Sequence, residues 1–245
     1  MLPQSKNKSI EAVLFDLDGT LLRSRMTELI PRYVEGLAAD CADFVKPKRF
    51  IKAKISAIRE LIQTAGDGSL TVEERLYAIM QRELGLPPAR LQQSLAHFQS
   101  HELVSLQDLV RPIPLAKQIL LECRERGVPL VLATNPVFPR FMVQARMDWG
   151  EIDGGFFRSI TTYENSRFCK PQAGYFLEIA AFLGVPPEHC LMVGNDLNHD
   201  LAAVAVGMET FLVDTWLVER GEPAWPCAQR GDHQQLQEFL RENLR

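Results

Sequence analysis

Short apolar runs alternate with segments of helical periodicity, and this alternation limits what the chain can fold into. The runs have the length of buried strands and lie at 11–17, 129–133, 157–162, 190–194 and 209–213. Two helical segments, 114–126 and 172–183, stop at Gly127 and Gly184, as helices often do. Strands that alternate with helices predict an α/β fold whose doubly wound, mostly parallel sheet is covered on both faces.

The alternation is interrupted after the first run. From about residue 27 to residue 108 we find only amphipathic helix patterns. Residues 50–62 place their apolar side chains on one stripe. Thr71 and Glu74 have the spacing of a capping box before the next stripe. The interruption therefore predicts an inserted all-helical unit.

The domain boundaries follow from this insertion. We expect an α/β core from 1–24 and 109–245 and a helical insertion over 25–108. Two prolines in 109–114 mark the return to the core. Near the end of the chain, 219–231 is predicted as a loop and 232–244 as a helix.

Composition argues against several classes of protein. The 245 residues carry a formal net charge of −4, which predicts neither a nucleic-acid partner nor an anionic membrane. No apolar run approaches the length of a membrane span, and the first ten residues lack the apolar stretch of a secretory signal. The five cysteines form no CxxC pair. Reduced thiols and a cytoplasmic location are expected.

Polar residues follow several of the predicted strands. In parallel sheets, ligands bind at the carboxyl ends of the strands, so these residues are candidates for one site. They are Asp16, Asp18, Gly19 and Thr20 after the first run, Thr134 and Asn135 after the second, Lys170 after the third, and Asn195, Asp196 and Asp200 after the fourth.

This set of side chains suits phosphoryl transfer. Several carboxylates in one cleft repel each other unless a hard divalent cation neutralises them, and all-oxygen ligands favour Mg²⁺ over zinc. One carboxylate can attack phosphorus to give an aspartyl-phosphate, and a second carboxyl can act as general acid and then as base. A hydroxyl, an amide and an ammonium are suitable donors to the phosphoryl oxygens.

Four motifs, in order and in strand position, resemble those of the haloacid dehalogenase superfamily. They are "DLDGT" at 16–20, "LATN" at 132–135, "CKPQAGYF" at 169–176 and "VGNDLNHD" at 193–200. The resemblance covers about 10–25 and 110–215, and the inserted helices resemble the cap that this superfamily places after its first motif. It therefore implies a Rossmann-like core with an inserted helical cap.

The resemblance also implies roles for single residues. Asp16 would be the nucleophile and a Mg²⁺ ligand, and Asp18 would be the acid and base and lend its backbone carbonyl to the metal. Asp196 and Asp200 would complete the metal site. Thr134 and Lys170 would assist catalysis by holding the phosphoryl group. The residues expected to bind phosphate are Gly19, Thr20, Thr134, Asn135 and Lys170.

The fourth motif departs from the pattern of the superfamily. It often reads Gly-Asp, whereas Asn195 follows Gly194 here. Either Asp196 becomes the direct ligand or Asn195 reaches the metal through its amide oxygen. We favour Asp196, because a carboxylate binds Mg²⁺ better than an amide does.

The resemblance implies the reaction as well as the fold. Members that cleave carbon–halogen bonds lack an Asp at the position of Asp18, so its presence favours phosphate esters. The expected function is a Mg²⁺-dependent phosphatase acting on a small phosphorylated metabolite. A phosphomutase, or a binding or regulatory protein without turnover, remains an alternative.

Two further clusters of side chains, one basic and one of histidines, are not expected to form functional sites. The run 46–54 carries five positive charges and is predicted to be a solvated helix face. His97 and His101 lie one helical turn apart but lack a third ligand, so no zinc site is expected. The sequence leaves the oligomeric state open.

Overall fold

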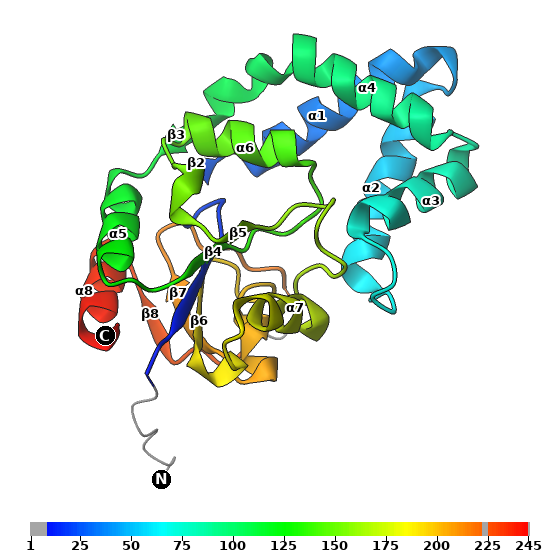
Figure 1. Cartoon of the computed structure of the whole chain (residues 1–245). Coiled ribbons are helices and arrows are strands. Elements are labelled where there is room, and N and C mark those ends of the chain that lie inside the picture. Colours follow the sequence, from blue (N-terminus) through cyan, green and yellow to red (C-terminus); the bar gives the residue numbers. More distant parts are fainter. Residues whose placement is uncertain (1–8, 222–224, 245) are drawn as a thin grey trace.

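A computed structural model describes residues 9–221 and 225–244 and contains a six-stranded parallel sheet at its centre (Figure 1). The strand order is β5-β4-β1-β6-β7-β8. The strands are β1 (Ala12–Phe15), β4 (Leu130–Leu132), β5 (Ser159–Ile160), β6 (Cys190–Gly194), β7 (Glu209–Val213) and β8 (Gln229–Gly231). All five apolar runs contain a strand, so the predicted α/β class is confirmed. The edge strand β8 lies in the stretch predicted as a loop, because its exposed polar residues carry no apolar pattern.

Alternate residues of β1 point into two cores. Val13 and Phe15 belong to a large cluster on one face, with side chains from α5 (Pro114–Glu125), α6 (Arg140–Trp149) and α8 (His233–Asn243). Ala12 and Leu14 belong to a smaller cluster on the other face, with α7 (Ala173–Leu183). Because both faces are buried, β1 is apolar throughout rather than alternating.

The register of the central strands places their carboxyl ends at one edge. Phe15, the last residue of β1, pairs with Leu132 of β4 and Val193 of β6. The residues that follow these three strands therefore emerge side by side.

The long strand-free stretch is helical, as predicted. It contains α1 (Met26–Asp40), α2 (Pro47–Gln63), α3 (Val72–Leu84) and α4 (Pro88–His101). The chain enters and leaves these helices through β2 (Leu22–Ser24) and β3 (Val110–Pro112), a two-stranded antiparallel ribbon missed by the sequence analysis. In Figure 1 the helices form an arch beside the sheet, reached through this ribbon.

Local sequence signals set the ends of several helices. Thr71 and Glu74 form the predicted capping box at the start of α3, and Gly184 ends α7 in the left-handed conformation. Short 3₁₀ turns complete the chain at η1 (Cys41–Asp43), η2 (Leu103–Leu109), η3 (Gly154–Phe156), η4 (Pro187–His189) and η5 (Leu201–Val206).

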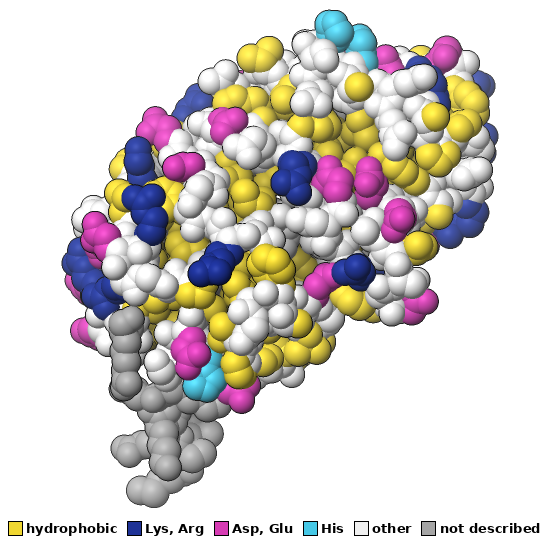
Figure 2. Space-filling model, in the orientation of Figure 1, with side chains coloured by type: hydrophobic (Ala, Val, Ile, Leu, Met, Phe, Trp, Pro, Cys, Tyr) yellow, Lys and Arg dark blue, Asp and Glu magenta, His cyan; other side chains and the backbone are white. Residues whose placement is uncertain are grey.

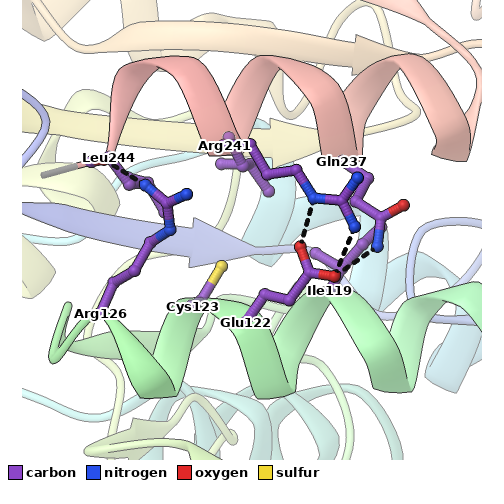
Figure 3. A pocket seen from close by; sticks show the side chains of 8 residues that line it. Ile119, Glu122, Cys123, Arg126, Gln237, Arg241 and Leu244 are labelled. Carbon is purple, nitrogen blue, oxygen red and sulfur yellow. Dashed lines mark hydrogen bonds and ion pairs between the residues drawn. The ribbon is translucent and has the colours of Figure 1, made fainter.

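The C-terminal helix α8 is attached to α5 by polar contacts (Figure 3). Glu122 accepts hydrogen bonds from Arg241 and Gln237, and Arg126 donates to the backbone carbonyl of Leu244. The cavity between these side chains measures about 10 Å³, room for one water. These contacts therefore fasten the terminal helix and do not form a ligand site.

The surface has no extended region of one charge on the face that Figure 2 shows, where basic and acidic side chains are interspersed. Within residues 9–221 and 225–244, no helix is long and apolar enough to cross a membrane.

Candidate active site

A cleft of about 420 Å³ lies at the carboxyl edge of the sheet, between the core and the inserted helices. Its lining includes eight of the ten candidate residues: Asp16, Asp18, Thr134, Asn135, Lys170, Asn195, Asp196 and Asp200. Gly19 and Thr20 are not in the lining. The strand ends therefore bring together most of a site that is spread over 185 positions in the sequence.

Lys170 connects two of the carboxylates. Its Nζ lies 2.7 Å from Oδ1 of Asp16 and 2.5 Å from Oδ1 of Asp200, and all three side chains are buried. Burial raises the pKa of Asp16 to about 7, although the Lys170 ammonium acts in the opposite direction. Burial disfavours the charged form of Lys170, but the two carboxylates outweigh it and raise the pKa of this lysine.

Asp200 has both carboxylate oxygens occupied. Oδ1 accepts from Lys170, and Oδ2 accepts from the backbone amides of Asn195 and Asp196 at 3.0 and 2.9 Å. A Cβ at Gly194 would collide with this carboxylate, so only glycine allows Asp200 to approach so closely. Asp200 therefore orients Lys170 and shapes the turn after β6.

Asp18 is held by residues from outside its own motif. Its Oδ1 accepts from Ser24 Oγ at 2.6 Å, and its Oδ2 pairs with the guanidinium of Arg146. Arg146 is fully buried on α6 and lies over the ring of Phe138, 4.7 Å from its centroid. The bend at Gly19, whose φ is +92°, allows Asp18 to line the same cleft as Asp16.

Asp196 forms an ion pair with the side chain of Arg220. Its Oδ2 lies 2.6 Å from Nη2 of Arg220, and its Oδ1 accepts from the backbone amides of Asn198 and His199. Burial raises the pKa of Asp196. The hydrogen bond from Arg220 and the charge of His199 lower this pKa and together outweigh burial, so the net shift is downward.

The side chain of Asn195 lies against the first motif. A Cβ at Gly19 would collide with its amide, and its Nδ2 donates to the carbonyl of Trp216 at 2.5 Å. Among the described residues no hydrogen bond uses Oδ1 of Asn195. This oxygen is therefore available to a ligand.

Thr134 is positioned through its backbone. Its carbonyl accepts from the hydroxyls of Thr161 and Tyr175, at 2.7 and 2.9 Å. Asn135 donates from Nδ2 to the Lys170 carbonyl, and its buried Oδ1 has no partner in the structure. Thr20 is buried outside the cleft lining. The backbone carbonyl of Thr20 accepts a hydrogen bond from Nε2 of His233, and the hydroxyl of Thr20 has no partner among the described residues. The predicted phosphate-binding role of Gly19 and Thr20 stays a prediction.

Comparison with known proteins identifies the family. The profile of the haloacid dehalogenase-like hydrolases matches residues 10–207. The chain belongs to this family.

Relatives within this hydrolase family include phosphatases. Phosphoglycolate phosphatase 1 of Pseudomonas aeruginosa is 29% identical over 196 residues, which span 80% of this chain and 66% of that protein. Ribulose-1,5-bisphosphate 5-phosphatase of Halopiger xanaduensis is 30% identical over 212 residues, spanning 83% of this chain and 84% of the relative. The fold matches that of a phosphatase of the same family from Thermococcus onnurineus, with a TM-score of 0.59 at 19% identity, covering 96% of this chain and 99% of that chain.

The carboxylates of this family member are largely neutralised by the protein itself. Arg146 pairs with Asp18, Arg220 with Asp196, and Lys170 with both Asp16 and Asp200. Among the described residues no group of three His, Cys, Asp or Glu side chains could hold a metal. The three carboxylates expected as Mg²⁺ ligands, those of Asp16, Asp196 and Asp200, therefore do not converge as arranged here.

Two oxygens nevertheless fit a hard cation. No hydrogen bond among the described residues uses Oδ2 of Asp16, and Oδ1 of Asn195 is likewise uncommitted. Both residues line the cleft. The carboxylate of Asp196 could bind the same cation only if its ion pair with Arg220 were broken.

Sequence reasoning missed several residues that shape the site. Arg146 and Arg220 neutralise carboxylates, and Gln172 donates to the carbonyls of Leu61 and Ile62 at the end of α2. Neither arginine lies in one of the four motifs, so only the fold brings them to the cleft. Gln172 stands within the third motif, but its partners lie 110 positions away.

Proposed function

We propose that this hydrolase is a Mg²⁺-dependent phosphatase that cleaves a small phosphomonoester through an aspartyl-phosphate at Asp16. One observation carries the proposal: Asp16 lies at the end of β1 with one carboxylate oxygen held by Lys170 and the other uncommitted on the cleft side. A nucleophile needs this combination of fixed position and free lone pair. The phosphatase names of the relatives support the same substrate class.

The other residues of the cleft fit steps of this reaction. Lys170 and the hydroxyl of Thr134 would bind oxygens of the phosphoryl group. Asp18 would protonate the leaving oxygen and later accept a proton from the attacking water. Its hydrogen bond to Ser24 and its ion pair with Arg146 fix its carboxyl within the cleft lining. This assignment favours phosphate-ester cleavage over dehalogenation.

Magnesium would be held by the carboxylate of Asp16 and by Oδ1 of Asn195, with the backbone carbonyl of Asp18 as a further ligand. The bound cation would supply positive charge to the transferring phosphoryl group. Asp196 would act as a partner of Arg220 rather than as a direct ligand, which reverses the preference drawn from the sequence. Calorimetric Mg²⁺ titration tests this choice: Asn195→Ala should weaken binding, and unchanged affinity in Asn195→Ala with weak binding in Asp196→Ala would restore the original preference.

The helices over 25–108 would act as the cap of the active site, with the core formed by 1–24 and 109–245. Met26 and Ile30 of α1 and Ile58 and Ile62 of α2 face the cleft from this side. A cap of this kind excludes water while the substrate is bound.

A panel of phosphorylated metabolites tests the proposed function. The purified protein with Mg²⁺ should release inorganic phosphate from at least one small phosphomonoester, and chelation with EDTA should abolish the release. Isomerisation without phosphate release would indicate a phosphomutase. Binding of a phosphate mimic without turnover on any ester would indicate a protein without catalytic function.

A further inference from the structure

The cleft has a polar floor and apolar walls. Asp16, Thr134 and Lys170 lie at the strand ends that form its floor. Apart from Thr27 of α1, the side chains that enclose it from α1, α2 and the loop after Asn135 are aliphatic or aromatic: Met26, Ile30, Ile58, Ile62, Val137 and Phe138. The same walls continue into an adjoining space of about 610 Å³. Beyond the floor, a bound molecule therefore meets mainly apolar side chains, with Thr27, His199 and Arg220 as the polar exceptions in this cleft.

The isoleucines of α2 are only partly used by the protein core. Ile55, Ile58 and Ile62 recur at helical spacing on one side of α2, and all three are half-buried. Fully buried residues of the same helix, such as Ala57 and Leu61, complete the core. The row of isoleucines thus packs against the core on one side and leaves an apolar surface to the cleft and the adjoining space on the other.

Two polar groups in the same space are committed to the protein, whereas Arg59 and Gln63 have no hydrogen bond or ion pair with a described residue. Gln172 bonds two backbone carbonyls of α2 through Nε2 and the amide of Cys169 through Oε1. Arg220 pairs with Asp196. A polyol hydroxyl that packs against Ile58, Ile62 or Phe138 would lose water without gaining a partner, which is unfavourable.

Resting on the proposed function, we propose that the site selects phosphomonoesters with an apolar leaving group, alkyl or aryl, over phosphorylated polyols and hydroxy acids. Phosphoryl oxygens bind to the floor, and the hydrocarbon part of the ester packs on Ile58, Ile62 and Phe138. Each methylene transferred from water into such a space raises kcat/KM by about fourfold until the cleft is filled.

The first test is a series of esters that differ only in the leaving group. We expect kcat/KM to rise from ethyl through butyl to hexyl phosphate, and hexyl phosphate to exceed glycerol 3-phosphate and 2-phosphoglycolate by at least tenfold. Equal or higher kcat/KM for the polyol and hydroxy-acid esters would overturn the inference and leave the proposed phosphatase function intact.

Matched variants locate the apolar contact. Ile58→Ser should lower kcat/KM for hexyl phosphate about tenfold and change that for ethyl phosphate much less. Ile51→Ser is the control, because Ile51 is also half-buried on α2 but does not line the cleft. Equal losses in the two variants, or equal losses for both esters, would contradict the proposed contact.

Binding of alkylphosphonates tests the inference without turnover. Calorimetry should give a lower Kd for hexylphosphonate than for methylphosphonate, and Ile58→Ser should reduce the difference. This result without hydrolysis of any ester would support the apolar site and overturn the proposed phosphatase function. Equal affinity for the two phosphonates would overturn the apolar site itself.

Discussion

At the scale of single residues, Asp18 and Arg146 form the least expected pair of the site. The guanidinium is fully buried, and its charge is balanced by the carboxylate of the proposed general acid. Removing one member of such a pair leaves an uncompensated charge, which costs more than the pair itself contributes.

We expect Arg146→Met to lower the free energy of unfolding by about 2–3 kcal/mol, less than for a fully buried pair because 15% of the Asp18 side chain is exposed. Urea denaturation measures the change. Arg25→Met is the control, since Arg25 pairs with Glu28 and Asp108 at an exposed site and should alter stability by less than about 1 kcal/mol. The Asp18→Asn/Arg146→Met double variant should recover part of the loss, and no recovery would argue against an electrostatic cause.

Lys54 is the exception to the predicted solvated face of 46–54, whose other four cations are exposed. Its side chain is 1% exposed, and its ammonium has no hydrogen bond or ion pair with a described residue. Burial lowers the pKa of Lys54 to about 7. Helix α2 therefore buries one ionisable amine that the sequence pattern does not distinguish from its exposed neighbours.

The depressed pKa of Lys54 predicts the pH dependence of stability. Between the folded value of about 7 and the unfolded value of 10.5, the unfolded chain binds more protons, so the free energy of unfolding rises with pH across this range. We expect Lys54→Met to increase stability by about 1–3 kcal/mol at pH 7 and to remove most of this rise. Thermal or urea unfolding at pH 6, 7, 8 and 9 checks both effects. An unchanged slope in the variant would mean that Lys54 is not the titrating group.

At the scale of secondary-structure elements, contacts between the core and the inserted helices decide how firmly the proposed cap is held. Gln172 bonds the last carbonyls of α2. The backbone amides of Val72 and Glu73, at the start of α3, donate to the carbonyls of Ser166 and Tyr163. Both ends of the α2–α3 connection are thus attached to core loops near Lys170.

Gln172→Ala should loosen the last turn of α2. We expect faster amide hydrogen exchange around residues 60–64 and a lower kcat/KM on the best ester, because Ile62 in the cleft wall loses its anchor. Gln144→Ala serves as control, since Gln144 bonds Asp148 within its own exposed helical turn. Unchanged exchange in the Gln172 variant would show that the backbone contacts of α3 alone hold this region.

Elements differ in how well the sequence predicted them. Strands with a continuous apolar pattern, such as β1 and β6, were predicted because burial on both faces imposes that pattern. The ribbon strands β2 and β3 and the edge strand β8 were missed, because three-residue strands with exposed side chains leave no such pattern. The capping box at Thr71 was predicted because it depends only on neighbours in the sequence.

At the scale of the whole molecule, the sequence indicated where the site lies but not how its charges are balanced. Parallel strands bring their carboxyl ends to one edge, so the convergence of Asp16, Thr134 and Lys170 was predictable from topology. The partners Arg146 and Arg220 come from segments without a recognisable motif. The expectation that only a metal could neutralise the carboxylates was therefore incomplete. The facing of Ile58 and Ile62 likewise required the packing of α2 against the core.

The most direct test of the proposed mechanism is to locate the phosphoryl group on the protein during turnover. Wild-type protein with Mg²⁺ is incubated with p-nitrophenyl phosphate, quenched in acid and analysed by peptide mass spectrometry. We predict one phosphoryl group on the peptide that contains Asp16, and neither this group nor phosphate release above background in Asp16→Asn. A phosphoryl group on another residue, or undiminished phosphate release by Asp16→Asn, would contradict the account.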